Sequence, residues 1–359
     1  MLIGIDGNEA NVKNRVGSNI YSFQLLKALS KLKPNAVIYL KKKPLQDLPK
    51  QNLNWQYKVV GPRLFWTQVG LPLALYLSSP KPDVFFTPGH YLPRWCPYPA
   101  VMAILDLGYI QFPEMFKKRD LWQLKNWTAY SVKKAKKILT ISESSRSAII
   151  DYYHLPPEKV VVTYPGLKMS KVNPKDNLKK YGVEGSFILY VGTLQPRKNL
   201  NGLIKAFAKL KNKNLKLVIV GKKGWLYENI FKQVKDLGLA EKVIFTGYVP
   251  DEDLPAFYKN AQCFILASLY EGFGLPILEA MHYGCPVVAS NVSSLPEVVG
   301  KAGILVNPND VNDITRGIKE AFKRKDELVK KGLRQCRQFS WEKCAKQTLA
   351  VLEDVAKNH

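Results

Sequence analysis

The sequence predicts an α/β protein made of two doubly wound, Rossmann-like domains that face each other across a cleft. Short runs of Val, Ile and Leu bounded by glycine alternate with helical stretches throughout the 359 residues, which is typical of parallel sheets covered on both faces. The pattern occurs twice, each time over roughly the length of one domain. A polar stretch over 168–185 separates the two runs, so we expect domains at 1–168 and 169–340.

The strands of the first domain are expected where apolar, β-branched residues cluster. These clusters lie at 2–6, 36–40, 57–60, 83–87, 101–105, 137–142 and 159–164, with helices notably at 18–32 and 121–135. In the second domain the clusters lie at 187–192, 215–221, 243–247, 263–268, 286–290 and 303–306, and helices at 199–210, 226–237, 253–260, 275–283 and 311–323 separate them. Ligands of such sheets bind beyond the carboxyl ends of the strands.

Composition limits the class of protein. With 46% hydrophobic and 23% charged residues, the chain can bury large cores, which excludes wholesale disorder. No apolar run reaches the roughly 18 residues of a spanning helix. The first residues lack the basic and apolar regions of a signal peptide. We therefore expect a cytoplasmic protein.

The charge is strongly positive. Lys and Arg number 54 against 29 Asp and Glu, a formal charge of +25, which attracts nucleic acid, anionic lipid or phosphorylated small molecules. Solvated lysines on helix faces would produce the same balance. No helix-turn-helix, zinc or RNA-binding motif supports nucleic acid as the partner. Peripheral contact with an anionic membrane is compatible with the charge.

No metal site is expected. The five cysteines do not form a pair or cluster with zinc-ligand spacing. The acidic run 251–253 has a DxD pattern, but it follows Pro250 and opens a predicted helix, where acidic residues are favoured as cap and first turn.

The strongest motif joins a strand to a helix over 268–290. Glu271 lies in a glycine-containing loop, Pro276 suits the first turn of the helix, and Glu279 lies one turn further on. Backbone amides at the helix start favour an anion, and a carboxylate one turn inside can accept hydrogen bonds from a cis-diol. An ordinary strand–loop–helix turn is the alternative interpretation.

A second motif follows the strand 187–192. Arg197 and Lys198 precede a helix at the carboxyl end of that strand. Cations are disfavoured at a helix N-terminus, so a binding role is favoured over a solvated pair. Two cations there can neutralise a diphosphate leaving group.

These motifs and their surroundings resemble the large retaining glycosyltransferase family 4, which has the GT-B fold. The segment EGFGLPILEA resembles the family's Glu-x7-Glu signature, and ILYVGTLQPRKNL, VIFTGYVPDEDLPAFY and SLPEVVG follow the family's order. The resemblance covers 187–352. FSWEKCAKQTLAVL resembles the family's closing helix, so we expect the helix 341–359 to pack back on the first domain. The first half is similar only in parts.

The resemblance implies roles for residues of the second domain. Glu271 contacts the hydroxyls of the donor sugar, Glu279 holds the ribose diol, and Lys198, with Arg197, stabilises the departing phosphate. The family often has Arg where this chain has Thr193. The donor is further expected to meet a loop that lies against the nucleobase and amides that cover sugar and phosphate: Gly247, Tyr248, Val249, Gly272, Phe273, Gly274 and Leu275.

In the first half, the segment at Gly17 resembles the family's glycine loop, which faces the phosphates. Arg15 lies two residues before Gly17. Asp106 is an acceptor-side candidate, although relatives commonly have His where this chain has Leu105. His90 is a candidate for the missing imidazole, or is structural. Arg146 is a candidate for the cleft.

The resemblance implies a retaining hexosyltransferase that uses a nucleoside diphosphate sugar without a metal. GDP-mannose is the first expected donor, since the motifs look most like the mannosyltransferase branch; UDP-glucose and UDP-N-acetylglucosamine stay open. The expected acceptor is a glycan, lipid-linked or otherwise, at the inner face of the membrane. An inactive partner subunit and a nucleic-acid-binding protein are the alternatives.

Overall fold

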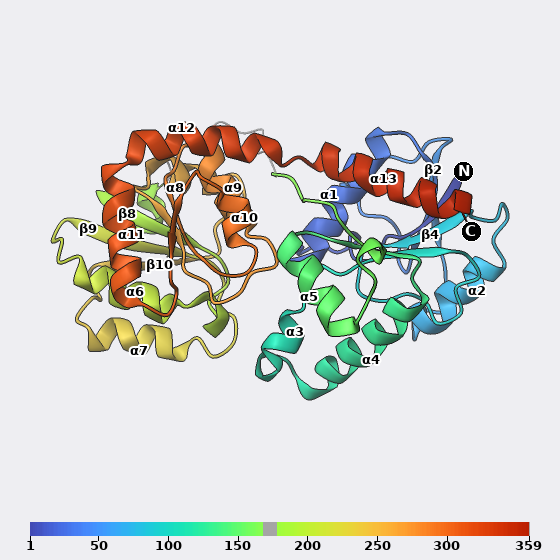
Figure 1. Ribbon diagram of the computed structural model, residues 1–359, viewed down its shortest axis with the longest axis horizontal. Coiled ribbons are helices and arrows are strands. Elements are labelled where there is room, and N and C mark those ends of the chain that lie inside the picture. The colour runs from blue at the N-terminus through green and yellow to red at the C-terminus, as the bar shows by residue number, and fades with distance from the viewer. Residues whose placement is uncertain (168–177, 359) are drawn as a thin grey trace. The chain divides into compact units, whose positions relative to one another are not determined.

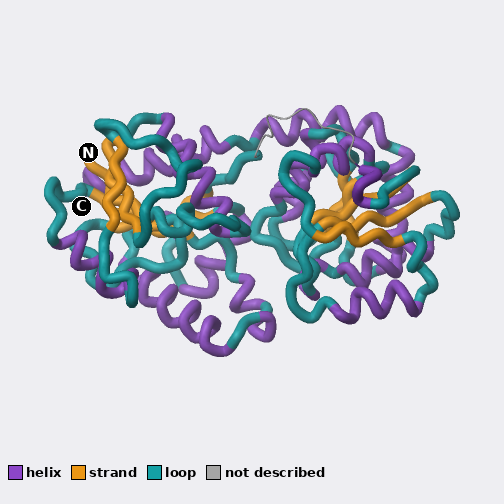
Figure 2. Tube along the Cα trace, turned by 180° about the vertical axis from the view of Figure 1, so that it is seen from behind, coloured by secondary structure: helices purple, strands orange, loops and turns teal. Residues whose placement is uncertain are grey.

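The computed structural model describes residues 1–167 and 178–358, which form two compact units. The first unit comprises Met1–Gly166 and Ser340–His359, and the second comprises Leu167–Phe339. Each unit has one parallel sheet at its centre with helices around it (Figure 2). The predicted α/β class with two Rossmann-like sheets is confirmed.

The first sheet has the strand order β3-β2-β1-β4-β5-β6-β7, with every pairing parallel. Its strands are β1 (Leu2–Asp6), β2 (Asn35–Leu40), β3 (Trp55–Val59), β4 (Val84–Thr87), β5 (Ala100–Ala103), β6 (Lys137–Thr140) and β7 (Val160–Val162). The strand β1 is central and pairs on both sides, with Ile5 opposite Ile38 of β2 and Phe86 of β4. The chain therefore reverses its winding direction beside β1.

Helices cover both faces of this sheet. They are α1 (Ser18–Lys31), α2 (Leu71–Tyr76), α3 (Gly108–Gln111), α4 (Lys118–Lys134), α5 (Glu143–Tyr153) and α13 (Trp341–Asn358). In Figure 1, α13 lies beside α1 above the strands, and α4 lies below them. The C-terminal helix thus completes the core of the unit in which the chain begins. Tyr21 of α1 packs against Trp341, the first residue of α13, with 5.8 Å between the ring centroids.

The second sheet has the order β10-β9-β8-β11-β12-β13, again parallel throughout. Its strands are β8 (Ser186–Val191), β9 (Leu215–Val220), β10 (Val243–Gly247), β11 (Phe264–Leu266), β12 (Val287–Ser290) and β13 (Ile304–Val306). Its helices are α6 (Leu200–Lys209), α7 (Glu228–Asp236), α8 (Leu254–Asn260), α9 (Leu275–His282), α10 (Leu295–Val299), α11 (Val311–Lys323) and α12 (Lys325–Gln335). The first three strands form one half of the sheet, and the chain then crosses over to β11 beside β8.

Some elements differ from the sequence prediction. Part of the predicted linker, 168–177, lies outside the described residues, but Leu178–Tyr181 forms a 3₁₀ turn, and Leu178 and Val183 are buried. The chain from 178 onward is therefore part of the second unit's core rather than linker. The helices α2 and α12 were not predicted, because α12 is dominated by charged residues and α2 follows directly on a π-helical turn, Trp66–Gly70.

Candidate active site

The candidate site of the second unit is centred on the carboxylate of Glu271, in the loop between β11 and α9. The Ser268 hydroxyl donates to Glu271 Oε1 at 2.7 Å, and Ser294 Oγ donates to the Glu271 carbonyl oxygen at 2.8 Å. The Glu271 N–H donates to Ser293 Oγ at 3.0 Å. Both the backbone and the side chain of Glu271 are thus fixed.

Two cations meet this carboxylate. Lys198 Nζ lies 2.5 Å from Glu271 Oε1, and an Arg197 terminal nitrogen lies 3.3 Å from Oε2. The same Arg197 nitrogen donates to the carbonyl oxygen of Tyr270 at 2.6 Å. Residues 197, 198 and 271, which the sequence assigned to one chemical step, therefore lie in direct contact.

The parallel topology explains this meeting. The cations follow β8 and Glu271 follows β11, and these two strands are neighbours, so their carboxyl ends lie at the same edge of the sheet. Asn199 ends the 3₁₀ turn with a left-handed φ of 53°, a conformation that Asn tolerates. Its amide caps α6 through the Gly202 N–H and donates to the Pro308 carbonyl. This double anchor holds the turn that carries both cations.

The cluster contains more positive than negative charge. Burial raises the pKa of Glu271, but the Lys198 and Arg197 charges and the hydrogen bonds from Lys198 and Ser268 outweigh it, so that its pKa is below the usual value. The carboxylate is therefore ionised, and two cations against one anion leave a net positive charge. Such a cluster attracts an anion such as a diphosphate.

The start of α9 is shaped by glycine. Gly274 has φ of 101°, and a Cβ there would lie 2.8 Å from Leu295 Cδ2, so a side chain is excluded on both counts. Phe273 beside it is buried against Phe339, with ring centroids 5.5 Å apart. The loop 272–275 is consequently held tightly in front of the helix N-terminus.

Glu279 lies one turn into α9, as predicted. Its Oε2 accepts a hydrogen bond from the Tyr258 hydroxyl of α8 at 2.8 Å. Burial, with the Glu279 charge, raises the pKa of Tyr258 well above its usual range, so the hydroxyl stays a donor. The carboxylate is oriented by this bond and is only half-buried.

The remaining residues predicted for the donor lie at the ends of β8 and β10. Gly247 has φ of 71°, Tyr248 is 60% exposed, and Val249 is buried. Lys222 Nζ lies 4.5 Å from the centre of the Tyr248 ring. Thr193 is exposed. The structure thus places an exposed aromatic ring and a cation beside the predicted nucleobase loop.

In the first unit, Gly17 directly precedes α1 with φ of 50° and is exposed. The nearby Arg15 side chain contacts three other residues of the same unit. Its guanidinium forms two hydrogen bonds with the Asp47 carboxylate, donates to the Ala10 carbonyl, and lies over the Phe23 ring at 3.8 Å. The local contacts of Arg15 are those of a residue that holds the loop before α1.

The other candidates of this unit differ in their surroundings. Asp106 follows β5 and accepts the Gly108 N–H at 2.8 Å. Burial lowers the pKa of His90, and the nearby Asp106 charge opposes this; no described residue bonds its buried Nδ1. The Arg146 guanidinium donates to the Val160 and Pro157 carbonyls, contacts that tie α5 to β7.

Two acidic residues that the sequence did not single out lie at the carboxyl end of the central strand β1, Asp6 as its last residue and Glu9 in the loop after it. Asp6 Oδ1 accepts the Asn8 N–H at 3.0 Å, while Glu9 Oε2 accepts from Asn19 at 2.6 Å and from Ser18 at 3.3 Å. Burial raises the pKa of Asp6 to about 7, with the Asn8 amide opposing and Glu9 adding to the shift. An acidic residue at the carboxyl end of a central strand was the available signal.

Asp253, the last residue of the acidic run 251–253, has structural contacts that the sequence did not indicate. Asp253 precedes α8, but its carboxylate makes no cap bond to the helix. It accepts hydrogen bonds from Lys180 Nζ at 2.6 Å and the Tyr181 hydroxyl at 2.7 Å. Within the described ranges, no three His, Cys, Asp or Glu side chains converge as a metal site requires. Metal independence itself stays a prediction.

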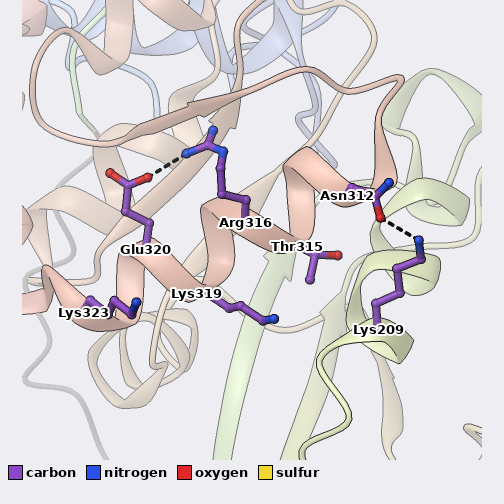
Figure 3. Close-up of a pocket in the computed structure, with 7 residues that line it drawn as sticks. All are labelled: Lys209, Asn312, Thr315, Arg316, Lys319, Glu320 and Lys323. Carbon is purple, nitrogen blue, oxygen red and sulfur yellow. Dashed lines mark hydrogen bonds and ion pairs between the residues drawn. The ribbon is translucent and has the colours of Figure 1, made fainter.

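A hollow of about 600 Å³ lies on the outer surface between α6 and α11 (Figure 3). Figure 3 shows Arg316 paired with Glu320, and Lys209 donating to Asn312 at 2.6 Å. These are helix-surface side chains that satisfy one another. The hollow contains none of Arg197, Lys198 and Glu271, and we do not place the active site there.

Comparison with known proteins identifies relatives. A family model described as "Glycosyl transferases group 1" matches residues 175–337. "O-antigen chain mannosyltransferase B" of Escherichia coli is 38% identical over 286 residues, covering 76% of this chain and 74% of that protein. The "MMP alpha-(1->4)-mannosyltransferase" of Mycolicibacterium hassiacum is 33% identical over 226 residues, covering 60% and 53%.

Solved structures share the fold. Sucrose-phosphate synthase from Thermosynechococcus elongatus aligns over 100% of both chains with a TM-score of 0.78 and 20% identity. HepE from Anabaena, in complex with UDP and glucose, aligns over 98% of this chain and 99% of its own with a TM-score of 0.73 and 19% identity.

The fold and the relatives together define a glycosyltransferase of the GT-B class. The chain belongs to the group 1 glycosyltransferases and is a hexosyltransferase, which confirms the resemblance drawn from the sequence. None of the helices in the described residues has the length and apolar character needed to cross a membrane.

Replacing Glu271 by Gln keeps the shape of the side chain and leaves two cations without a counter-ion. We expect the free energy of unfolding to fall by about 1–3 kcal/mol at neutral pH. The pKa of Glu271 is lowered in the folded state, so this difference is present above about pH 4.5 and shrinks as the pH falls through the folded pKa. Urea unfolding at several pH values measures it. An equal effect of Glu241→Gln, which is exposed, would contradict the assignment.

Replacing Asp6 by Asn removes a titrating carboxyl and keeps an acceptor for the Asn8 N–H. The pKa of Asp6 is about 7 when folded against 3.8 as the reference, so the native state binds the extra proton between these values. Wild-type stability should therefore decline as the pH rises from about 4 to 7. The variant should lack this decline and be the more stable protein at pH 8. Parallel slopes for both proteins would refute the assignment.

Proposed function

We propose that this enzyme transfers mannose from GDP-mannose to a hydroxyl group of a glycan, free or lipid-linked, with retention of the anomeric configuration. The choice of mannose is supported by the 38% identical relative, a mannosyltransferase by name. UDP-glucose and UDP-N-acetylglucosamine are the alternative donors, and the structure of HepE from Anabaena in complex with UDP and glucose supports keeping a uridine nucleotide open.

The contact of Glu271 with Arg197 and Lys198 is the observation on which the mechanism rests. In the proposed reaction the bond between the sugar's anomeric carbon and the diphosphate oxygen breaks. The acceptor oxygen bonds to that carbon on the same face, and its proton passes to the leaving diphosphate. Arg197 and Lys198 stabilise the negative charge that develops on the diphosphate. Glu271 holds both cations in place and accepts hydrogen bonds from the sugar.

The nucleotide is proposed to lie along α9 and the end of β10. The Glu279 carboxylate, oriented by Tyr258, accepts hydrogen bonds from the ribose diol. The amides of Gly272 to Leu275 lie at the helix start, where an anion is favoured. With two cations already facing the diphosphate, we propose that no metal is required.

Contact with an anionic membrane is proposed for the face of α2. Val69, Leu73, Tyr76 and Leu77 are 46%, 52%, 57% and 71% exposed, and their spacing places them along one side of the continuous helix formed by the π-helical turn and α2. The opposite side, with Leu71 and Leu75, is buried. Such a stripe on a chain of charge +25 favours the surface of an anionic bilayer, consistent with action at its cytoplasmic side.

A thermal-shift panel tests the donor. GDP, GDP-mannose, UDP, UDP-glucose and UDP-N-acetylglucosamine are compared in the presence of EDTA. At 100 times Kd a ligand adds about 2.7 kcal/mol, which raises Tm by roughly 5–10 °C for domains of this size. We expect GDP-mannose to give the largest shift and Glu279→Gln to reduce it. A larger shift with a uridine nucleotide would overturn the choice of donor.

Transfer of mannose to the acceptor tests the mechanism directly. Glu271→Ala should reduce kcat by about 10²-fold or more, because the phosphate-stabilising cations lose their anchor. The matched control is Glu241→Ala, an exposed glutamate of the same unit. Near-wild-type transfer by Glu271→Ala, with Tm recorded for both variants, would refute the mechanism.

Sedimentation with vesicles tests membrane contact. The wild type should bind vesicles of phosphatidylglycerol and phosphatidylcholine, less so at high salt, and bind phosphatidylcholine alone weakly. Leu73→Ser with Leu77→Ser should weaken binding at least tenfold, whereas Leu53→Ser, at a leucine that is 94% exposed in a turn before β3, should not. Equal binding by all variants would exclude the α2 face.

A further inference from the structure

The loop after β12 holds the main chain of Glu271. The strand β12 pairs in parallel with β11, so this loop lies at the same edge of the second sheet as the loop that carries Glu271. Ser293 and Ser294 belong to it and directly precede α10. Ser293 Oγ accepts the Glu271 N–H at 3.0 Å, and Ser294 Oγ donates to the Glu271 carbonyl oxygen at 2.8 Å. Two adjacent serines thus hold both polar groups of one residue's main chain.

Ser293 has a backbone conformation that is unfavourable for serine. Its φ is 52°, in the left-handed region, which is sterically disfavoured for residues other than Gly, Asn and Asp. A glycine would adopt this conformation without strain, but it has no hydroxyl to accept the Glu271 N–H. The serine therefore combines a strained backbone with a hydrogen bond that the unstrained residue could not make.

Ser294 lacks a contact that its own helix would normally have. It occupies the N-cap position of α10, where a serine hydroxyl usually accepts an N–H of the first turn. Within the described part of the chain, the Ser294 hydroxyl accepts no such bond and instead donates to the Glu271 carbonyl oxygen. The side chain is fully buried. Neither serine is therefore used where it would best stabilise its own segment.

Contacts from both neighbouring strands meet at Glu271. The strand β11 lies between β8 and β12 in the sheet. From the β8 side, Arg197 and Lys198 hold the carboxylate; from the β12 side, the two serines hold the main chain. The ion pairs alone would let the peptide groups of Glu271 turn, and the carboxylate would turn with them. Unfavourable local conformations that converge on one site are typical of a functional requirement.

We propose that Ser293 and Ser294 are positioning residues for hexose transfer, and that the strained backbone of Ser293 is retained because its hydroxyl directs the Glu271 carboxylate. This inference rests on the proposed role of Glu271 in transfer. It separates two properties of residue 293. Stability depends on how well the residue tolerates a left-handed φ, whereas catalysis depends on the hydroxyl that accepts the Glu271 N–H.

Two substitutions of Ser293 test this separation. Ser293→Gly and Ser293→Ala both remove the hydroxyl, but only glycine relieves the strain, so the glycine variant should have the higher Tm. Release of GDP from GDP-mannose, with a mannose oligosaccharide as acceptor, measures catalysis below the lower Tm. Both variants should lose kcat equally, by about tenfold or more, because Glu271 is less well positioned. The donor KM should change by less than about twofold, since an interaction needed in the transition state is lost.

Lys211 provides the matched control. It is exposed and has a φ of 51°, so Lys211→Gly should have a higher Tm than Lys211→Ala, with wild-type kcat in both. An equal loss of kcat in Lys211→Gly would overturn the inference, because the loss would then not depend on the Ser293 hydroxyl. Wild-type kcat in Ser293→Gly, combined with a reduced kcat in Ser293→Ala, would overturn it too, since activity would then follow stability.

A double-mutant cycle tests whether Ser293 acts through Glu271 and separates this inference from the proposed function. In a protein that carries Glu271→Ala, adding Ser293→Gly should change kcat by less than about twofold, because residues that act as a unit are not additive. The same loss in both backgrounds would overturn the positioning role. A reduced kcat in Glu271→Ala with wild-type kcat in Ser293→Gly would overturn that role alone. Wild-type kcat in Glu271→Ala would overturn the proposed mechanism, and the inference with it.

Discussion

The buried carboxylate of Glu271 is the constraint around which the second unit is organised. A carboxylate removed from water is costly unless it is paired and hydrogen-bonded, and here Lys198, Arg197 and Ser268 all meet it. Those partners come from two adjacent strands, and the backbone of Glu271 is fastened to Ser293 and Ser294. The cluster therefore fixes two loops and a helix start in one arrangement before any ligand binds.

This preorganisation has a functional consequence. Two cations held by one carboxylate keep a surplus positive charge at the carboxyl edge of the sheet. Because these cations are already in position, they do not have to reorganise when negative charge develops on a leaving group. The same pairing keeps Glu271 ionised, because nearby positive charge outweighs burial in setting its pKa. Stability and charge placement thus depend on the same three side chains.

In the first unit, other contacts hold the loops at the carboxyl ends of the strands. Its central strand β1 ends at Asp6, and the chain that follows is fastened to the segment after β2 by the side-chain amides of Asn8 and Asn11 and by the Arg15–Asp47 ion pair. The loops after β1 and β2 are therefore fixed to each other before any ligand binds.

The sequence by itself determined the alternation of strands and helices, the parallel sheets, the loops that carry Glu271 and Lys198, and the place of Glu279 in a helix, because buried apolar runs, glycines and helix starts are local signals. Tertiary structure decided what each polar group contacts. Asp253 pairs with Lys180 across 73 positions and Arg15 with Asp47 across 32, and the Gln68 Oε1 atom is buried with no donor among the described residues. Partners so distant along the chain are set by strand order and packing, which no local pattern contains.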